Sequence, residues 1–257
     1  MRNRFYTLLT LLSFVLSCFG EVVSISTPAD LIAFASRVNA GELTLDAVLT
    51  TDIDMTGQEW PKPIGCWSPK INNASVMYKG HFDGNGKTIS NLVYTTKQNY
   101  HGLFGVVSTG ALIENFTITG TVTNASYNEF GTVGFARDSN PTIRNVHSYL
   151  NFNNTKAGVR IGGIVGNAYN GTTNIERCIY SGTLSVVDAE NAGNYGGMVG
   201  IGNNSTSSIC NITDCLFDGK VINTATTPGN CTLGGMVGYS NSAIITIKNS
   251  LSIGTVP

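Results

Sequence analysis

The sequence is poor in charge and in histidine. Only 12% of its 257 residues are charged, the formal net charge is −1, and no long basic run is present. A nucleic-acid partner is therefore not expected, because binding to the phosphate backbone depends on clustered Lys and Arg. The three histidines are His81, His101 and His147, and none is followed by Glu. The H-E-x-x-H zinc motif of metalloproteases is thus absent.

Proline is scarce, with 7 residues, whereas glycine is abundant, with 30. This balance favours ordered β-structure with many turns over a disordered tract. Apart from the N-terminus, the chain has no long hydrophobic run. That terminus, MRNRFYTLLTLLSFVLSCFG, combines a short basic segment with an apolar stretch that is too short to span a bilayer. Residues 1–20 are predicted to be a signal peptide, so we expect a secreted or cell-surface protein. Lipid attachment at Cys18 remains an alternative to cleavage.

The stretch Asp-Gly-Asn-Gly-Lys-Thr, residues 83–88, invites comparison with nucleotide and calcium loops. A P-loop requires glycine at residue 81, which is His81. An EF-hand loop that begins at Asp83 requires Glu at its twelfth position, which is Tyr94. Gly and Asn tolerate positive φ, so the stretch is predicted to be a tight turn. The sequence predicts no cofactor and no metal site.

Two short patterns recur in alternation along the chain. The first is Gly-x-x-Gly, at intervals of 29, 32, 34 and 38 residues: 102–105, 131–134, 163–166, 197–200 and 235–238. The second resembles Ile-x-Asn, at intervals of 24, 30, 32, 37 and 35 residues: 89–91, 113–115, 143–145, 175–177, 212–214 and 247–249. Each unit is rich in β-branched residues and turns, and has room for two or three strands. Such units can bury their aliphatic faces only by stacking.

The repeats therefore predict an all-β fold, a parallel β-solenoid (β-helix), over residues 66–257, with one coil per unit of about 24–38 residues. Stacking would place Asn91, Asn115, Asn145 and Asn249 in a hydrogen-bonded ladder at one corner, interrupted by Arg177 and Asp214. Residues 21–65 are predicted to form an N-terminal cap. Thr27, Pro28 and Asp30 have the pattern of a helix start, and Gly41 that of a stop. We expect a helix at about 28–40 that covers the first coil.

Several of these motifs follow one another in an order typical of a known family: 52–57 (DIDMTG), 60–65 (WPKPIG), 80–92 (GHFDGNGKTISNL) and 102–105 (GLFG). The chain resembles GLUG-motif repeat proteins from about Val22 to its end. Similar segments occur in bacterial adhesin-like proteins and in the non-catalytic part of immunoglobulin A peptidases. The resemblance implies a right-handed β-helix with a surface or adhesive role, and no catalytic residues. The later Gly-x-Val-Gly copies depart from the motif, with Thr, Ile or Met in place of Leu.

Stacked Ile-x-Asn units would align their middle residues, including Glu114, Arg144 and Glu176. Glu114 and Glu176 would then lie about 10 Å apart, near the separation of an inverting glycosidase pair. Arg144 between them favours a structural charge ladder that avoids like-charge stacking. Both interpretations remain open at this point.

The same stacking would make Cys178 and Cys215 neighbours. Their expected spacing of about 5 Å is compatible with a disulfide, or with two buried thiols. Asn-x-Ser/Thr sequons offer candidate glycosylation sites. Asn115 also begins a sequon, but a glycan on its side chain would be incompatible with a place in the buried corner ladder. The candidates are Asn73, Asn124, Asn153, Asn170, Asn203, Asn204 and Asn230.

The expected function is that of a secreted or cell-surface, non-enzymatic repeat protein. It would be adhesive or structural, or would bind a glycan or a host or matrix protein. The alternative is a β-helix carbohydrate-active enzyme, a polysaccharide hydrolase or lyase that uses Glu114 and Glu176. The C-terminal coil lacks a capping motif, so end-on self-association is a further expectation. A longer repeat array, of which this chain is one part, is also compatible with the pattern.

Overall fold

The computed structural model describes residues 20–60, 62–66, 76–96, 100–124, 129–154, 158–186, 193–223 and 231–257, without the side chains of residues 95, 96, 124, 154 and 203–206. The predicted signal peptide up to residue 19, with Cys18, lies outside the described residues. Among the described residues, no helix has the length and hydrophobicity needed to cross a membrane.

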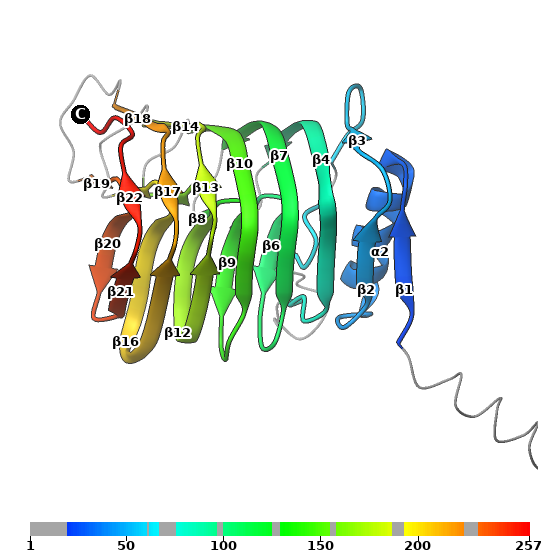
Figure 1. Ribbon diagram of the computed structural model, residues 1–257, viewed down its shortest axis with the longest axis horizontal. Helices are drawn as coiled ribbons and strands as arrows, with labels where there is room; N and C mark the ends of the chain where they lie inside the picture. Colours follow the sequence, from blue (N-terminus) through cyan, green and yellow to red (C-terminus); the bar gives the residue numbers. More distant parts are fainter. Residues whose placement is uncertain are drawn as a thin grey trace, which may run out of the picture.

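The expected all-β parallel solenoid is confirmed. Strand pairings are parallel throughout the described residues, and strands from successive coils lie side by side in chain order (Figure 1). The strands of the larger sheet are β1 (Val22–Ile25), β2 (Asp46–Leu49), β3 (Ile53–Asp54), β4 (His81–Thr96), β6 (Phe104–Val107), β7 (Leu112–Asn124), β9 (Val133–Arg137), β10 (Thr142–Asn154), β12 (Val165–Glu176), β13 (Ile179–Tyr180), β14 (Thr183–Val186), β16 (Val199–Thr213), β17 (Leu216–Phe217), β18 (Lys220–Asn223), β20 (Val237–Asn241), β21 (Ile244–Lys248) and β22 (Leu251–Ser252). The smaller sheet consists of β5 (Tyr100–His101), β8 (Glu129–Phe130), β11 (Arg160–Gly162), β15 (Asn194–Gly196) and β19 (Thr232–Gly234).

Helix α2 (Pro28–Ala40) lies at the N-terminal end of the solenoid (Figure 1). The side chain of Thr27 accepts a hydrogen bond from the backbone of Asp30, whose carboxylate accepts one from the Thr27 backbone, and Gly41 ends the helix. The buried Phe34 packs its ring 6.0 Å from those of Tyr78 and Phe82, centroid to centroid. The helix thereby covers the aromatic side chains at the start of the solenoid.

The interior is built from columns of apolar side chains, one from each coil. In the best-defined column, each side chain is paired in register with the next and the first five are fully buried: Phe82, Ile113, Ile143, Ile175, Ile212 and Ile247. A second column joins the Gly-x-x-Gly motifs of five successive coils: Phe104, Val133, Val165, Val199 and Val237. Burial of these aliphatic columns supplies the main driving force for stacking.

Glycine is required in the Gly-x-x-Gly motif because neighbouring backbones approach closely there. A Cβ atom at Gly200 would lie 2.6 Å from the carbonyl oxygen of Gly166 in the preceding coil. A Cβ at Gly166 would lie 2.5 Å from the carbonyl oxygen of Gly134. The repeated glycines therefore reflect contact between coils as well as the tight turns expected from the sequence.

The last coil, with β20, β21 and β22, leaves apolar side chains in solvent at the end opposite α2. Ile244, Ile247, Leu251 and Ile253 are 54%, 47%, 56% and 60% exposed. End-on self-association through this surface stays a prediction. Because α2 covers the opposite end, we expect a closed tail-to-tail dimer instead of an open chain of copies.

We expect the purified chain to form such dimers at micromolar concentration and the double variant Ile244→Lys/Ile247→Lys to be monomeric. Two charges on this surface would have to be desolvated in the dimer. Sedimentation equilibrium measures the difference. A wild-type protein that is monomeric across the same concentration range would contradict the prediction.

Candidate functional site on the outer face

A column of mostly charged side chains runs across the outer face of β4, β7, β10, β12, β16 and β21. The register aligns them in this order: Asp83, Glu114, Arg144, Glu176, Thr213 and Lys248. Glu114, Arg144 and Glu176 thus occupy neighbouring strands in the order that the sequence analysis proposed. The residue paired with Glu114 on the preceding strand is Asp83, and not Ser90, the middle residue of the Ile-x-Asn copy at 89–91.

The placement of Asn91 in the same corner ladder as Asn115 is therefore wrong. Strand β4 has irregularities between Asp83 and Lys87 and between Ile89 and Leu92, so Ile89 pairs with Ile118 instead of Ile113. Asn91 lies at a different corner, where its side-chain amide donates to Asp54 Oδ1 at 2.8 Å. The extra residues of the 83–88 turn displace the first Ile-x-Asn copy along the coil.

Glu114 is the centre of a hydrogen-bond network. Its side chain is only 7% exposed. One carboxylate oxygen, Oε2, lies 2.5 Å from Arg144 Nε, and the other, Oε1, lies 2.8 Å from His81 Nε2. Burial acts to raise the pKa of Glu114, but the hydrogen bonds from Arg144 and His81 outweigh it and hold the pKa below its usual value. Glu114 is therefore a carboxylate at neutral pH.

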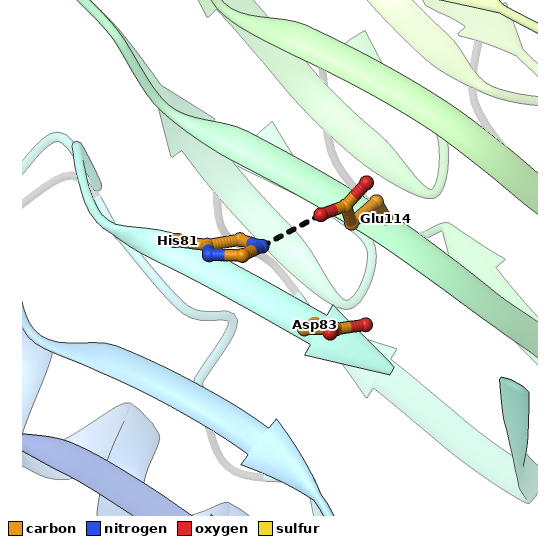
Figure 2. A group of neighbouring side chains, drawn as sticks. All are labelled: His81, Asp83 and Glu114. Carbon is orange, nitrogen blue, oxygen red and sulfur yellow. Dashed lines mark hydrogen bonds and ion pairs between the residues drawn. The ribbon is translucent and has the colours of Figure 1, made fainter. Parts of the chain in front are cut away.

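His81 and Asp83 lie on β4 beside Glu114 on β7, and all three side chains point to the same region (Figure 2). One ligand atom from each of the three lies within 4.8 Å of the others. Asp83 Oδ1 accepts hydrogen bonds from Asn115 Nδ2 at 3.0 Å and from the Asn85 backbone at 2.7 Å. The sequence predicted no metal site. The three residues belong to no linear motif, because Glu114 comes from a different coil than His81 and Asp83.

The corner that follows the charge column repeats one unusual backbone conformation. Asn115, Asn145, Arg177, Asp214 and Asn249 all have positive φ, between 48° and 62°. Asn tolerates this left-handed conformation better than most residues, which explains its recurrence.

Side-chain hydrogen bonds connect this corner from coil to coil. Asn145 Nδ2 donates to Asn115 Oδ1 at 2.8 Å, and Arg177 Nε donates to Asn145 Oδ1 at 2.8 Å. Arg177 therefore continues the ladder that it was expected to interrupt.

A surface groove of about 450 Å³ lies along this corner. Its lining combines a carboxylate, amides, a hydroxyl and aromatic rings: Asp83, Asn85, Gly86, Asn115, Phe116, Thr117, Asn145 and His147. The ring of His147 lies 4.0 Å from that of Tyr149, centroid to centroid, and Tyr149 is 41% exposed. The groove thus offers hydrogen-bonding groups next to an exposed aromatic surface.

The pair Glu114 and Glu176 has poor geometry for glycoside hydrolysis. Arg144 lies between the two carboxylates in the register and binds Glu114 directly. An inverting pair needs room for a substrate and a water molecule between its members. The arrangement favours a structural charge ladder.

A second carboxylate, Glu129, is buried on β8 of the smaller sheet, two residues before a Gly-x-x-Gly motif. Its Oε1 accepts from Arg160 Nη1 at 2.6 Å and from Asn167 Nδ2 at 3.1 Å. Its Oε2 is buried without a hydrogen-bond partner among the described residues, as is Asn167 Oδ1. Burial raises the pKa of Glu129 despite the nearby charge of Arg160.

Of the two alternatives for Cys178 and Cys215, the structure contains two buried free thiols and no disulfide between them. They do come from adjacent coils, and the Cys178 backbone N–H donates to Cys215 Sγ at 3.4 Å. Each thiol lies within hydrogen-bond distance of two carbonyls: Cys178 Sγ of those of Glu176 (3.4 Å) and Ile143 (3.5 Å), and Cys215 Sγ of those of Thr213 (3.3 Å) and Ile175 (3.5 Å). Burial raises the pKa of Cys178 well above its usual value. The two residues act as small apolar side chains of the core.

Glycosylation at the predicted sequons stays a prediction. Asn73 and Asn230 lie outside the described residues, as do the side chains of Asn124, Asn203 and Asn204. Asn153 is exposed, whereas Asn170 donates through Nδ2 to Asp138 Oδ1 at 3.3 Å.

Asn115 contributes its side-chain amide to the corner ladder. We expect it to be unmodified.

Sequence relatives of this chain are much longer proteins. The chain is 40% identical over 73 residues to a protein of Evansella cellulosilytica named "Putative Gly-rich membrane protein", a match that covers 28% of this chain and 8% of that protein. It is 37% identical over 122 residues to "Halomucin" of Haloquadratum walsbyi, and this match covers 46% of this chain and 1% of that protein. Each match thus covers less than a tenth of the length of the relative. No family model matches it, so membership of the GLUG-motif proteins stays a prediction.

A solved structure shares the fold. The crystal structure of "a putative immunoglobulin A1 protease from Bacteroides ovatus" superposes with a TM-score of 0.65, covers 90% of this chain and 66% of that chain, and is 19% identical in sequence. At this identity the likeness shows the β-solenoid arrangement alone. The chain is thus a β-solenoid repeat protein, similar in sequence to segments of a Gly-rich membrane protein and of a halomucin.

Proposed function

We propose that this chain is a non-enzymatic glycan-binding module of a secreted or cell-surface repeat protein. The observation that carries the proposal is the groove along the corner ladder. Its amides and carboxylate are arranged beside the exposed ring of Tyr149. The similarity to segments of a membrane protein and a halomucin supports a location at the cell surface.

The chemistry of the groove suits a sugar. Asn and Asp side chains exchange hydrogen bonds with hydroxyl groups, whose donors and acceptors they match. A Tyr ring supplies an apolar surface on which the C–H face of a pyranose can stack, while its O–H stays in water. The corner ladder holds Asn115 and Asn145 in fixed positions before a ligand arrives, which reduces the entropy lost on binding.

A glycan array probed with the purified full chain, followed by calorimetry on each positive glycan, tests this proposal. Tyr149→Ala is expected to weaken binding about tenfold, because loss of one aromatic stacking surface costs about 1.4 kcal/mol. Tyr239→Ala is the matched control: Tyr239 is 45% exposed, close to the 41% of Tyr149, but lies on the last coil. Its binding is expected to be unchanged.

Two results would count against the proposal. The first is the absence of binding to a panel of neutral and acidic polysaccharides at millimolar sugar concentration. The second is release of new reducing ends from a bound polysaccharide that stops in Glu114→Gln and Glu176→Gln variants, which would establish the enzymatic alternative.

A further inference from the structure

We propose that His81, Asp83 and Glu114 form a binding site for a divalent transition-metal ion such as Zn²⁺ on the outer face of the solenoid. The proposal shares only Asp83 with the groove proposed to bind a glycan, and Zn²⁺ binding is measured without any sugar present. Two adjacent strands supply the ligands: β4 contributes His81 and Asp83, which are two residues apart on one face, and β7 contributes Glu114 (Figure 2).

The ligand atoms are close to the geometry that such an ion requires. Ligands about 2.0–2.1 Å from a tetrahedral ion lie about 3.3 Å from one another. His81 Nε2 and Glu114 Oε1 are 2.8 Å apart, so they need to separate by roughly half an ångström. All three ligand atoms lie within 4.8 Å of one another, so Asp83 needs to approach by no more than about 1.5 Å. Side-chain rotation without backbone movement is sufficient for shifts of this size.

The second coordination layer fixes two of the three ligands. Asn115 and the Asn85 backbone both donate to Oδ1 of Asp83, which orients the carboxylate so that Oδ2 is the oxygen that meets the ion. Arg144 Nε holds Oε2 of Glu114, which directs Oε1 toward His81. Hydrogen bonds of this kind around metal ligands raise affinity by fixing their orientation.

The charges of the column also favour a cation at this place. Asp83 and Glu114 are directly paired in neighbouring strands, and like charges in such positions repel each other. Arg144 compensates one of the two negative charges through the far oxygen of Glu114. The two carboxylates and one guanidinium sum to a charge of −1 (−1 −1 +1). A divalent ion between the facing oxygens removes the repulsion that remains.

The ligand set selects the class of metal. One imidazole nitrogen with two carboxylate oxygens matches zinc and other first-row transition ions, whereas Ca²⁺ prefers six to eight oxygen ligands. Three protein ligands leave at least one coordination position for water. Asp83 also lines the groove, so the ion would lie at its edge.

Isothermal titration calorimetry of the tag-free full chain with Zn²⁺ alone tests the proposal, supported by the absorption spectrum of bound Co²⁺. We expect one ion per chain, and a loss of affinity of at least about tenfold in each of His81→Ala, Asp83→Asn and Glu114→Gln. Glu176→Gln is the matched control, since Glu176 occupies the same column two strands away from Glu114. Its Zn²⁺ affinity is expected to stay within about twofold of wild type.

The His81→Ala variant separates loss of metal binding from loss of folding. His81 is 42% exposed, so His81→Ala is expected to retain the wild-type urea midpoint even if Glu114→Gln is destabilised. Full Zn²⁺ affinity in a folded His81→Ala variant would place the ion elsewhere, for example on a thiol, and would overturn the proposal. So would the absence of Zn²⁺ binding to the wild-type chain at millimolar concentration, or displacement of Zn²⁺ by an equal concentration of Ca²⁺.

Discussion

Replacement of Ile175 by Ala is expected to lower the free energy of unfolding by about 3 kcal/mol, within the range of about 2–5 kcal/mol found for such changes in cores. Ile175 is fully buried and lies between Ile143 and Ile212 in the central column. Truncation removes three carbon atoms in contact with both neighbouring coils. Because each coil of a solenoid is stabilised mainly by its neighbours, the cavity weakens two interfaces at once.

The control for this prediction comes from the same column. Ile247 has the same role in the repeat pattern but is 47% exposed in the last coil. Ile247→Ala is therefore expected to cost less than about 1 kcal/mol. Urea unfolding followed by circular dichroism measures both variants at submicromolar concentration, where the tail-to-tail dimer does not bury Ile247. Equal losses of stability would contradict the stacked core, because they would mean that burial differs little between the two positions.

Replacement of Arg160 by Met is expected to destabilise the fold by about 2–3 kcal/mol at pH 7, because it leaves the carboxylate of Glu129 buried without its cation. This loss of stability is smaller than the roughly 3–5 kcal/mol typical when a fully buried ion pair is broken. The reason is that Arg160 is 34% exposed, so water partly screens its charge. The double variant Glu129→Gln/Arg160→Met is expected to recover most of the lost stability, because it has no buried charge at this position.

The pH dependence of stability gives a second readout of Glu129. Its pKa in the folded state is raised by burial above the ordinary value of 4.5. The folded protein therefore holds this proton at pH values where the unfolded chain has lost it. The stabilisation that Glu129 contributes is fully present below its pKa in the unfolded chain. It is lost as the pH rises from that value to the pKa in the folded protein.

Arg160→Met should extend this fall to higher pH, because the guanidinium counteracts part of the upward shift of the Glu129 pKa. Variants with Gln at position 129 should lack this component of the fall. Urea titrations between about pH 4.5 and 8 measure the slopes. A wild-type slope equal to that of Glu129→Gln would contradict the burial of an unpaired carboxylate oxygen.

Particular residues show how far sequence reasoning extends. Ile113, Ile143, Ile175 and Ile212 were placed in one column from their spacing, because a stacked coil must repeat its apolar positions in order. The same logic failed for Ile89, since the additional residues of the 83–88 turn shift the register of β4 and put Phe82 in the column instead. A periodic motif cannot reveal a bulge, because bulged residues satisfy the same hydrophobic pattern one step further along the strand.

The candidate sites depended still more on three-dimensional contacts. The alignment of Glu114 with Arg144 and Glu176 followed from the repeat. His81 and Asp83 escaped notice as ligands because their partner is 31 residues away from Asp83 in sequence and becomes adjacent only through the register of β4 and β7. The sequence signal for this pairing is that His81 and Asp83 flank Phe82 and that Glu114 follows Ile113, because Phe82 and Ile113 are the second residues of β4 and β7 and are paired in register. The repeat places Cys178 and Cys215 on adjacent coils, but their spacing alone does not decide between a disulfide and two thiols.

The sequence by itself determined the parallel layers, the N-terminal helix and the corner where Asn recurs, because these follow from local conformational preference and from the periodic need to bury aliphatic side chains. Only the tertiary structure decided which polar side chains face one another across strands. It also decided that Ile175 is buried while Ile247, at the equivalent position of the last repeat, is exposed. Those outcomes depend on register and on the neighbours supplied by other coils, and neither is encoded in any single repeat.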